Sequence, residues 1–223
     1  MTKCNKHLTI ILALLVLPAF LFTGCLKEGD DTLVLPLPYG KIPYDVIPER
    51  IQDSLVQHGF VINEGVYPPS IEGKYVASPM DEQYASDNYF NPNFRYLYMA
   101  FTDQHLRGKL DYRQVQRDTI FLNEQQFIDA SSETQGQVIG EDSNFTMYCI
   151  QTIYVDSIRW SKTASVVSGT WTKAGIKNCQ YAECIIETHD DPSQPRLSEV
   201  GTYRIWNDGD KLAIPSFTEK TDK

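Results

Sequence analysis

Most of the chain after residue 70 alternates between two opposite faces, which is the period of a β-strand. Residues 94–103 place Leu97, Met99 and Phe101 on one face, and the other face is apolar and aromatic as well. Residues 145–155 repeat this pattern. Because neither face of these two strands is polar, we expect both faces to be covered. Further strands are predicted at residues 71–78, 110–116, 137–141, 161–172, 176–188, 200–206 and 211–214.

Short turns separate several of these strands. The segments Arg107-Gly108 and Lys173-Ala174-Gly175 each lie between two strand-like runs, as do residues 207–210, which contain an Asp-Gly pair. Such residues favour tight hairpins between antiparallel neighbours. About eight strands without a second layer of helices must close on themselves or form a sandwich, because exposed edges promote aggregation. The pattern therefore predicts an all-β, antiparallel fold.

One short amphipathic helix precedes the strands, at residues 48–58. Ile47, Ile51 and Leu55 recur every four residues, Pro48 suits a first helical turn, and Gly59 suits a C-terminal cap. The apolar stripe of this helix must be buried. We expect the helix to pack across the end or the side of the β domain.

The N-terminus has the pattern of a bacterial secretion signal. Lys3 and Lys6 precede an apolar run of 14 residues, 8–21, which is short for a membrane-spanning helix. The following Leu-Phe-Thr-Gly-Cys resembles the lipobox of bacterial lipoproteins, with Phe at one position where Leu is usual. This resemblance implies that residues 1–24 are removed and that Cys25 is acylated, which anchors the chain to a membrane. A spanning anchor and an ordinary cleaved signal are the alternatives.

The residues after Cys25 indicate in which membrane the protein is located. Leu26 is not the Asp that retains enteric lipoproteins in the inner membrane, so we expect the outer membrane of a Gram-negative bacterium, with the face left open. Residues 27–31 resemble the acidic signal that exports some lipoproteins to the outer face of that membrane. The alternative is that they form a solvated acidic linker. Residues 25–46 are interpreted as a proline-containing tether. The alternative is that residues 33–35 and Tyr39 dock on the domain as an edge strand.

The charge excludes one class of partner. The leader holds two of the 20 basic residues and none of the 29 acidic ones, so the mature chain carries 18 basic and 29 acidic residues, a net charge of −11. Such a surface repels phosphate backbones. We therefore expect no nucleic-acid partner.

The segment Pro68-Pro69-Ser70-Ile71-Glu72-Gly73-Lys74-Tyr75, after a short helix, resembles the entry to a lipocalin-like barrel. In that family a Gly-x-aromatic signature opens the first strand, usually with Trp where this chain has Tyr75, and a late basic residue packs over the ring. Arg204 could take that place, which would make Gly73 and Arg204 structural residues. The resemblance, also to uncharacterised Gram-negative lipoproteins, implies an eight-stranded up-and-down barrel over residues 47–223 that holds one small ligand.

Catalytic motifs are poorly represented. The mature chain has three histidines, His58, His105 and His189, and it lacks the motifs of metalloproteases, serine hydrolases and phosphate-binding loops. His189-Asp190-Asp191 is better explained as a polar loop than as a metal site. We predict no enzyme, no catalytic residue, no metal and no cofactor.

Three cysteines remain after removal of the leader and acylation of Cys25. Cys179 and Cys184 are five residues apart and so point to opposite faces of one strand. Cys149 lies on the apolar face of its own strand. We hypothesise a disulfide bond between Cys149 and Cys184, with buried free thiols as the alternative.

The aromatic and apolar residues support two functions. In a ligand-binding barrel, seven side chains would line an apolar pocket for a small hydrophobic molecule. In a surface module, exposed rings of Tyr84, Tyr89 and Phe90 would contact a glycan or protein partner. Each ring is individually more consistent with core packing. A barrel enzyme of unknown reaction is the third alternative. The seven pocket residues are Tyr75, Leu97, Met99, Phe101, Phe145, Met147 and Trp171.

Overall fold

The computed structural model describes residues 40–87, 95–105, 108–118, 124–154, 158–190, 193 and 197–216. All of them belong to one folded unit, Pro36–Lys223. The leader, Cys25, and residues 33–35 and Tyr39 lie outside the described residues.

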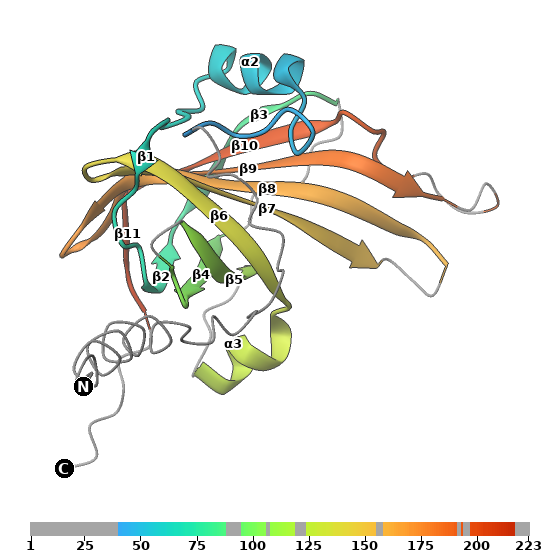
Figure 1. Ribbon diagram of the computed structural model, residues 1–223. Coiled ribbons are helices and arrows are strands. Elements are labelled where there is room, and N and C mark those ends of the chain that lie inside the picture. The colour runs from blue at the N-terminus through green and yellow to red at the C-terminus, as the bar shows by residue number, and fades with distance from the viewer. Residues whose placement is uncertain are drawn as a thin grey trace, which may run out of the picture. The chain divides into compact units, whose positions relative to one another are not determined.

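Two helices and eleven strands occur among the described residues (Figure 1). The helices are α2 (Glu49–Gln57) and α3 (Glu124–Ala130). The strands are β1 (Val66–Tyr67), β2 (Gly73–Ala77), β3 (Met80–Ala85), β4 (Tyr96–Thr102), β5 (Lys109–Arg117), β6 (Glu133–Glu141), β7 (Asn144–Tyr154), β8 (Trp160–Thr172), β9 (Gly175–His189), β10 (Tyr203–Asp208) and β11 (Leu212–Pro215).

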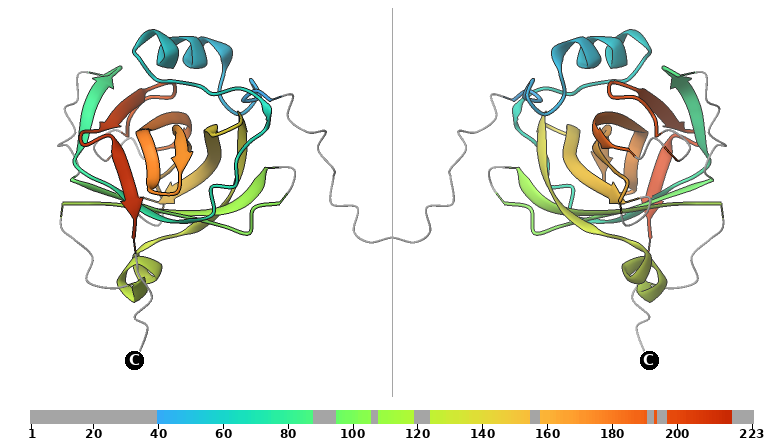
Figure 2. Two further views of the ribbon diagram at one scale, coloured as in Figure 1. Left: turned by 90° about the vertical axis from the view of Figure 1, so that its left-hand side faces the viewer. Right: turned by 90° about the vertical axis from the view of Figure 1, so that its right-hand side faces the viewer.

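The sheet closes because two pairs of short strands each act as one bent strand. β10 and β11 both pair antiparallel with β9, through Asn207 opposite Gln180 and Leu212 opposite Lys177. β2 pairs with β11, and β3, which follows β2 in the chain, pairs with β10. The ring therefore contains eight antiparallel strands. The views in Figure 2 look along the closed barrel. The predicted all-β, up-and-down barrel preceded by one short helix is confirmed.

Some elements differ from the sequence prediction. β3 was not predicted, because its residues Met-Asp-Glu-Gln-Tyr-Ala carry little apolar alternation. The parallel pair between β1 and β6 and the helix α3 were also not predicted, since each depends on contacts with residues distant in the chain. The strands β7, β8 and β9 extend beyond the rest of the barrel in Figure 1.

α2 covers the outer face of the barrel, as the amphipathic pattern predicted. Ile51 and Leu55 are buried against the strands, and Gln52 Nε2 donates to the carbonyl oxygens of Ile42 and Ile47 at 3.0 and 2.7 Å. Ile42 is itself buried, so residues 40–46, expected to be the end of the tether, pack with the folded unit. The buried outer cluster comprises Ile42, Ile47, Ile51, Leu55, Phe60, Ile139, Tyr148, Ala164, Val166, Ala182, Cys184, Tyr203 and Ile205.

α3 explains why β4 is apolar on both faces. Phe127 of α3 packs against Tyr98, Ala100 and Val115 on the outer face of β4 and β5. Figures 1 and 2 place α2 and α3 on opposite sides of the barrel. Each helix therefore covers an outer sheet face that would otherwise expose aromatic and aliphatic side chains.

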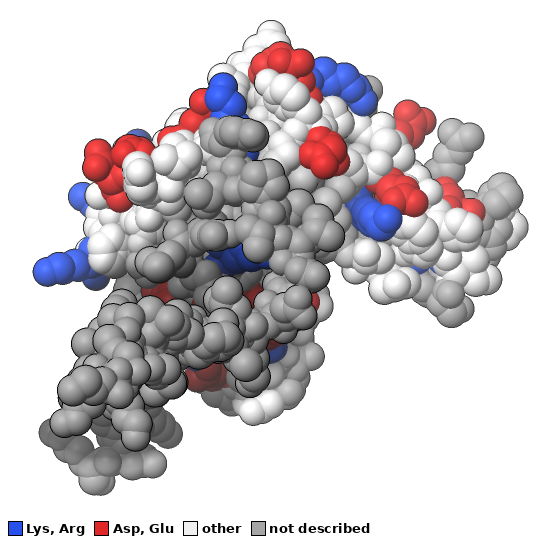
Figure 3. All heavy atoms as spheres, in the orientation of Figure 1, with Lys and Arg blue, Asp and Glu red and all other residues white. Residues whose placement is uncertain are grey.

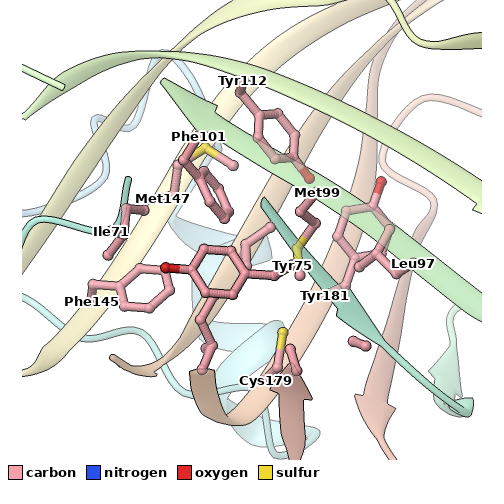
Figure 4. Packing of buried hydrophobic residues seen from close by; sticks show 14 of the residues in the cluster. Ile71, Tyr75, Leu97, Met99, Phe101, Tyr112, Phe145, Met147, Cys179 and Tyr181 are labelled. Atoms are coloured by element: carbon pink, nitrogen blue, oxygen red, sulfur yellow. The ribbon is translucent and has the colours of Figure 1, made fainter. Parts of the chain in front are cut away.

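The other face of every strand points into the barrel and forms the interior cluster. Its side chains come from all eight strands of the ring, and ten of them are labelled in Figure 4. The interior cluster comprises Ile71, Tyr75, Ala77, Met80, Leu97, Met99, Phe101, Leu110, Tyr112, Val138, Phe145, Met147, Cys149, Val167, Ile176, Cys179, Tyr181, Trp206 and Ala213.

The surface carries both signs of charge. On the face shown in Figure 3, acidic and basic side chains are interspersed rather than gathered into one field. Neither helix that the structure describes has the length and apolar character needed to cross a membrane.

Candidate functional site

The seven residues predicted to line an apolar pocket all meet inside the barrel. Six belong to the interior cluster and are at most 5% exposed, and Trp171 packs against them. Figure 4 shows Tyr75, Leu97, Met99, Phe101, Phe145 and Met147 gathered inside the barrel. A cavity between them would leave their atoms accessible to solvent, so an apolar ligand here would have to displace core side chains.

The Gly-x-aromatic signature has a physical cause in this structure. Gly73 has a φ of +144°, and a Cβ at this position would lie 2.9 Å from the hydroxyl oxygen of Tyr75. Tyr75 Oη donates to the Glu72 carbonyl oxygen and accepts from Trp171 Nε1, both at 3.2 Å. Gly73 therefore leaves room for the ring that follows it.

The contact expected between Arg204 and Tyr75 is corrected. Trp171 holds the Tyr75 hydroxyl, while the Arg204 guanidinium pairs with Asp87, with Nη2 2.9 Å from Oδ2. The physical reason is the position of the two side chains. The Tyr75 hydroxyl points toward Trp171, near the β8–β9 turn. Arg204 lies on β10 opposite Glu183, in the middle of β9 and therefore at a different level of the barrel.

The hypothesised disulfide bond is also corrected, because Cys149, Cys179 and Cys184 are all free thiols. Cys149 lies opposite Ser165, and Ser165 lies opposite Glu183, so the inward neighbour of Cys149 on β9 is Glu183. Cys184 is one residue further and points into the outer cluster. Burial raises the pKa of Cys149 to about 12 and that of Cys184 to about 11.

A layer of inward-facing polar side chains lies above the apolar interior. We name it the mouth cluster: Gln114, Gln116, Gln151, Ser165 and Glu183. It occupies the end of the barrel away from the β6–β7 and β8–β9 turns, where the interior face changes from apolar to polar.

Two tyrosines form the floor of the mouth cluster. Tyr112 and Tyr181 are fully buried, and in Figure 4 their hydroxyl groups lie on the side of the interior cluster opposite to that of Tyr75. Tyr112 Oη donates to Gln114 Oε1 at 2.7 Å, and Gln114 Nε2 donates to Tyr181 Oη at 2.7 Å. Burial raises the pKa of both tyrosines well above the usual value, so both stay neutral.

Glu183 is the acidic group of the mouth cluster. Its Oε1 accepts from Gln116 Nε2 at 2.7 Å and from the Tyr181 hydroxyl. Burial raises the pKa of Glu183, and the hydrogen bonds from Tyr181 and Gln116, together with the charge of Arg204, oppose this shift. The result is a carboxyl group held in a defined orientation by two donors.

Three residues of the mouth cluster are partly accessible to solvent, whereas Gln151, Ser165 and the tyrosines below them are buried. Gln114, Gln116 and Glu183 face inward and are nevertheless partly exposed, whereas Tyr181 beneath them is fully buried. Thr163, which pairs with Gln151 across β7 and β8, has a buried Oγ1 without a hydrogen-bond partner among the described residues. The mouth cluster therefore contains partly exposed hydrogen-bonding residues, and a buried hydroxyl group without a described partner lies beside it.

The rim of the mouth cluster is acidic. Glu82 lies near Arg204, and burial raises the pKa of Glu82 while the arginine charge opposes that shift. Arg204 thus stands among three carboxyl groups, those of Glu82, Asp87 and Glu183. When all are ionised, the excess of negative charge disfavours anionic ligands.

Sequence reasoning missed this site, although a signal was present. Within the strand predicted at residues 110–116, Leu110 and Tyr112 are followed on the same face by Gln114 and Gln116. A switch from apolar to polar on one face of a buried strand is unusual, because buried polar groups need partners. Those partners come from other strands.

The remaining predicted residues lie elsewhere. Tyr84 is no free ring, since it stacks on His58 with ring centroids 3.6 Å apart. Tyr89, Phe90 and Cys25, the predicted lipidation residue, lie outside the described residues. His189 stacks on Trp160, and within the described ranges no three His, Cys, Asp or Glu side chains gather closely enough to hold a metal ion.

The fold and the site together define a closed eight-stranded antiparallel barrel with a buried apolar interior and a polar layer at one end. No protein-family model, curated protein or solved structure matches the chain.

Proposed function

We propose that this protein is a lipid-anchored, non-catalytic binding protein, lipocalin-like in architecture, whose barrel takes a small ligand at the mouth cluster. One observation carries the proposal. Three inward-facing residues with hydrogen-bonding side chains, Gln114, Gln116 and Glu183, are partly exposed above a buried tyrosine floor. Ligand sites combine an apolar lining with a few placed polar groups in this way.

The chemistry of the mouth cluster indicates the class of ligand. Glu183 offers a hydrogen-bond acceptor to a ligand. The surrounding carboxyl groups favour a ligand with a neutral or cationic donor over a ligand with a carboxylate. Ile153 and Ile185 lie on the same face beyond Gln151 and Glu183, where they are partly or fully exposed. The ligand we propose is therefore a small, largely apolar molecule that carries a hydrogen-bond donor.

Binding is better supported than catalysis. Tyr112 and Tyr181 are kept neutral by burial, and Glu183 is oriented by two donors rather than placed against a nucleophile. A general acid or base needs a reacting partner within hydrogen-bond reach. We therefore assign the mouth cluster to recognition.

The location rests on the N-terminal sequence. We propose that acylated Cys25 holds the barrel at the outer membrane of a Gram-negative bacterium through the proline-containing segment that follows it. The net charge of −9 for the whole chain supports partners other than nucleic acid.

The test compares three ligands that share one apolar chain and differ in the head group. Dodecanol, dodecylamine and dodecanoic acid would be titrated into the mature chain carrying Cys25→Ser, followed by native mass spectrometry and calorimetry. We expect the alcohol or the amine to bind more tightly than the acid. Glu183→Gln should weaken that binding about tenfold, while Glu187→Gln, an exposed residue paired with Lys162, should not.

Two outcomes would contradict the proposal. If none of the three molecules binds, the barrel is not a receptor for amphipathic ligands. If all three bind equally and Glu183→Gln has no effect, the apolar chain binds elsewhere and the mouth cluster is structural. Turnover of any probe would assign the protein to the enzymes.

A further inference from the structure

One carboxyl oxygen of the mouth cluster is accessible and accepts no hydrogen bond. Both bonds that Glu183 receives, from Gln116 Nε2 and from the Tyr181 hydroxyl, go to Oε1, so Oε2 accepts none from a described residue. Glu183 is partly exposed, and its Oε2 is not among the enclosed side-chain atoms that lack a partner in the described part of the chain. The carboxyl group is therefore oriented through one oxygen and open at the other.

The amide oxygen of Gln116 is in the same state. Gln116 Nε2 donates to Glu183 Oε1 at 2.7 Å and to Tyr181 Oη at 3.2 Å, and these two bonds orient the amide. Gln116 Oε1 accepts no hydrogen bond from a described residue, and it is not enclosed. The two open acceptor oxygens thus belong to one hydrogen-bonded pair of side chains.

Most donors of the mouth cluster are already engaged. Gln114 Nε2 donates to Gln151 Oε1 at 3.1 Å and to Tyr181 Oη at 2.7 Å, and Ser165 Oγ donates to Gln151 Oε1 at 3.3 Å. Gln151 Nε2 donates to no described residue and is the one open donor of the cluster. Two open acceptors and one open donor favour a ligand head group that mainly donates.

The charge around Glu183 favours a cation. Arg204 lies opposite Glu183 on β10, and its Nη2 is 3.2 and 2.9 Å from Oδ1 and Oδ2 of Asp87. This bidentate pair compensates the charge of Arg204. Glu183 itself forms no ion pair with a described residue, and Glu82 adds another carboxyl group near Arg204. When the carboxyl groups are ionised, negative charge remains beside the open oxygens.

A primary ammonium group matches this arrangement. It carries a positive charge, three N–H donors and no acceptor. An alcohol has a single donor and no charge, and a quaternary ammonium group has the charge without any donor. A calcium ion takes about six to eight oxygen ligands, which is more than the two open oxygens provide.

We propose that the mouth cluster selects a primary amine, whose ammonium group donates to Glu183 Oε2 and Gln116 Oε1. The apolar part of the molecule would lie against Ile153 and Ile185, which follow on the same face of the barrel. This inference rests on the proposed function, because it identifies the head group of a ligand at the same site.

The experiment compares three probes that share a dodecyl chain: dodecylamine, dodecanol and dodecyltrimethylammonium. Each is titrated by calorimetry at neutral pH, below the concentration at which it forms micelles, into the mature chain carrying Cys25→Ser. We expect dodecylamine to bind about tenfold more tightly than either of the other two probes. The alcohol reports the contribution of charge, and the quaternary ammonium reports the contribution of the N–H donors.

Two variants test the residues, and a third is the matched control. Glu183→Gln should lower the ratio of amine to alcohol affinity to about one. Asp87→Asn keeps both open oxygens but leaves Arg204 without its partner, so it should weaken amine binding severalfold and leave alcohol binding unchanged. Glu187→Gln removes an exposed carboxylate from the same strand, paired with Lys162, and should keep the amine preference.

The outcomes separate this inference from the proposed function. If dodecanol binds as tightly as dodecylamine, amine selection is wrong and the binding site itself remains supported. If dodecyltrimethylammonium binds as tightly as dodecylamine, or if the amine preference survives in both Glu183→Gln and Asp87→Asn, the two open oxygens do not hold the head group. If no probe binds, both proposals fail. Circular dichroism establishes that each variant is folded, and Asp87→Asn carries the test if Glu183→Gln is not.

Discussion

The hydroxyl group of Tyr181 donates to the carboxyl group of Glu183, two residues further along β9, at the level where the barrel interior changes from apolar to polar. Tyr181 also receives hydrogen bonds from Gln114 and Gln116, at 2.7 and 3.2 Å. Its ring stacks on Trp206 with centroids 5.5 Å apart. One side chain therefore links the apolar interior to the polar layer above it.

Removing the Tyr181 hydroxyl should destabilise the fold. In Tyr181→Phe the ring still stacks on Trp206, but the carboxyl group of Glu183 loses a donor and Gln114 loses an acceptor. We expect a loss of roughly 1–3 kcal/mol in the free energy of unfolding, measured by urea denaturation. Tyr112→Phe removes one hydrogen bond and should cost less. If both variants lose the same free energy of unfolding, the Tyr181 hydroxyl does not stabilise the fold more than the Tyr112 hydroxyl does.

A methyl group at Gly73 should be more harmful than one at Gly59. Both residues have positive φ angles, +144° and +89°, but a Cβ at Gly73 would meet the Tyr75 ring, whereas a Cβ at Gly59 would meet nothing within 4 Å. Gly59→Ala thus reports the backbone strain alone. We expect Gly73→Ala to lower the free energy of unfolding further, by roughly 1–3 kcal/mol in total. A smaller loss for Gly73→Ala would mean that the Tyr75 ring shifts without cost.

Asp208 should make the protein less stable as the pH rises. Its pKa is raised to about 7 in the folded protein and lies near 4 when unfolded. The folded state thus binds a proton that the unfolded state has released, and this stabilisation is present below about pH 4 and lost as the pH rises through about 7.

Asp208→Asn removes this titration. Urea unfolding at pH 5 and pH 8 should show the variant gaining stability relative to the unmodified chain at the higher pH. The comparison must be a difference between the two chains, because burial also raises the pKa of Glu82 and Glu183. An identical pH dependence in both chains would rule out Asp208 as the cause.

The three thiols should be unreactive in the folded protein and reactive once it unfolds. Cys149, Cys179 and Cys184 are buried, and burial raises the pKa of each, so little thiolate forms at neutral pH. Iodoacetamide without reductant should label none of them in the native mature chain carrying Cys25→Ser and all three in urea, read by mass spectrometry. Labelling of one thiol alone in urea would indicate a disulfide bond.

Acylation of Cys25 should determine where the protein is found. In a Gram-negative host, Cys25→Ser should shift the full chain from the membrane fraction to the soluble fraction, because the lipid anchor is lost. Cys4→Ser, within the leader that we propose is removed, should leave the protein in the membrane fraction. Fractionation and the mass of the mature N-terminus measure both. Membrane retention of Cys25→Ser would show another anchor.

Several features followed from local pattern. The helix at residues 49–57 and most strands were predictable because their periods, 3.6 and 2 residues, are written in neighbouring positions. The apolar character of both faces of β4 correctly indicated that its outer face is covered. Which element covers it was not predictable, since Phe127 reaches Tyr98 only through the fold.

The candidate site shows the same division. The seven predicted apolar residues were recognisable as inward-facing by alternation, and they do lie together. Whether they enclose a cavity depends on how tightly side chains from different strands fill the barrel. Gln116 and Glu183 meet because β5 and β9, which are not paired with each other, face one another across the barrel. No local spacing in the sequence encodes this arrangement.

The sequence by itself determined the strand-rich composition, the helix before the barrel and the alternation that divides each strand into an inner and an outer face. The tertiary structure alone decided that Glu183, and not Cys184, is the inward neighbour of Cys149, and that β2 with β3 and β10 with β11 close the ring. The physical reason is register. Side-chain direction reverses at every residue, so a shift of one position between strands exchanges the interior for the outer face.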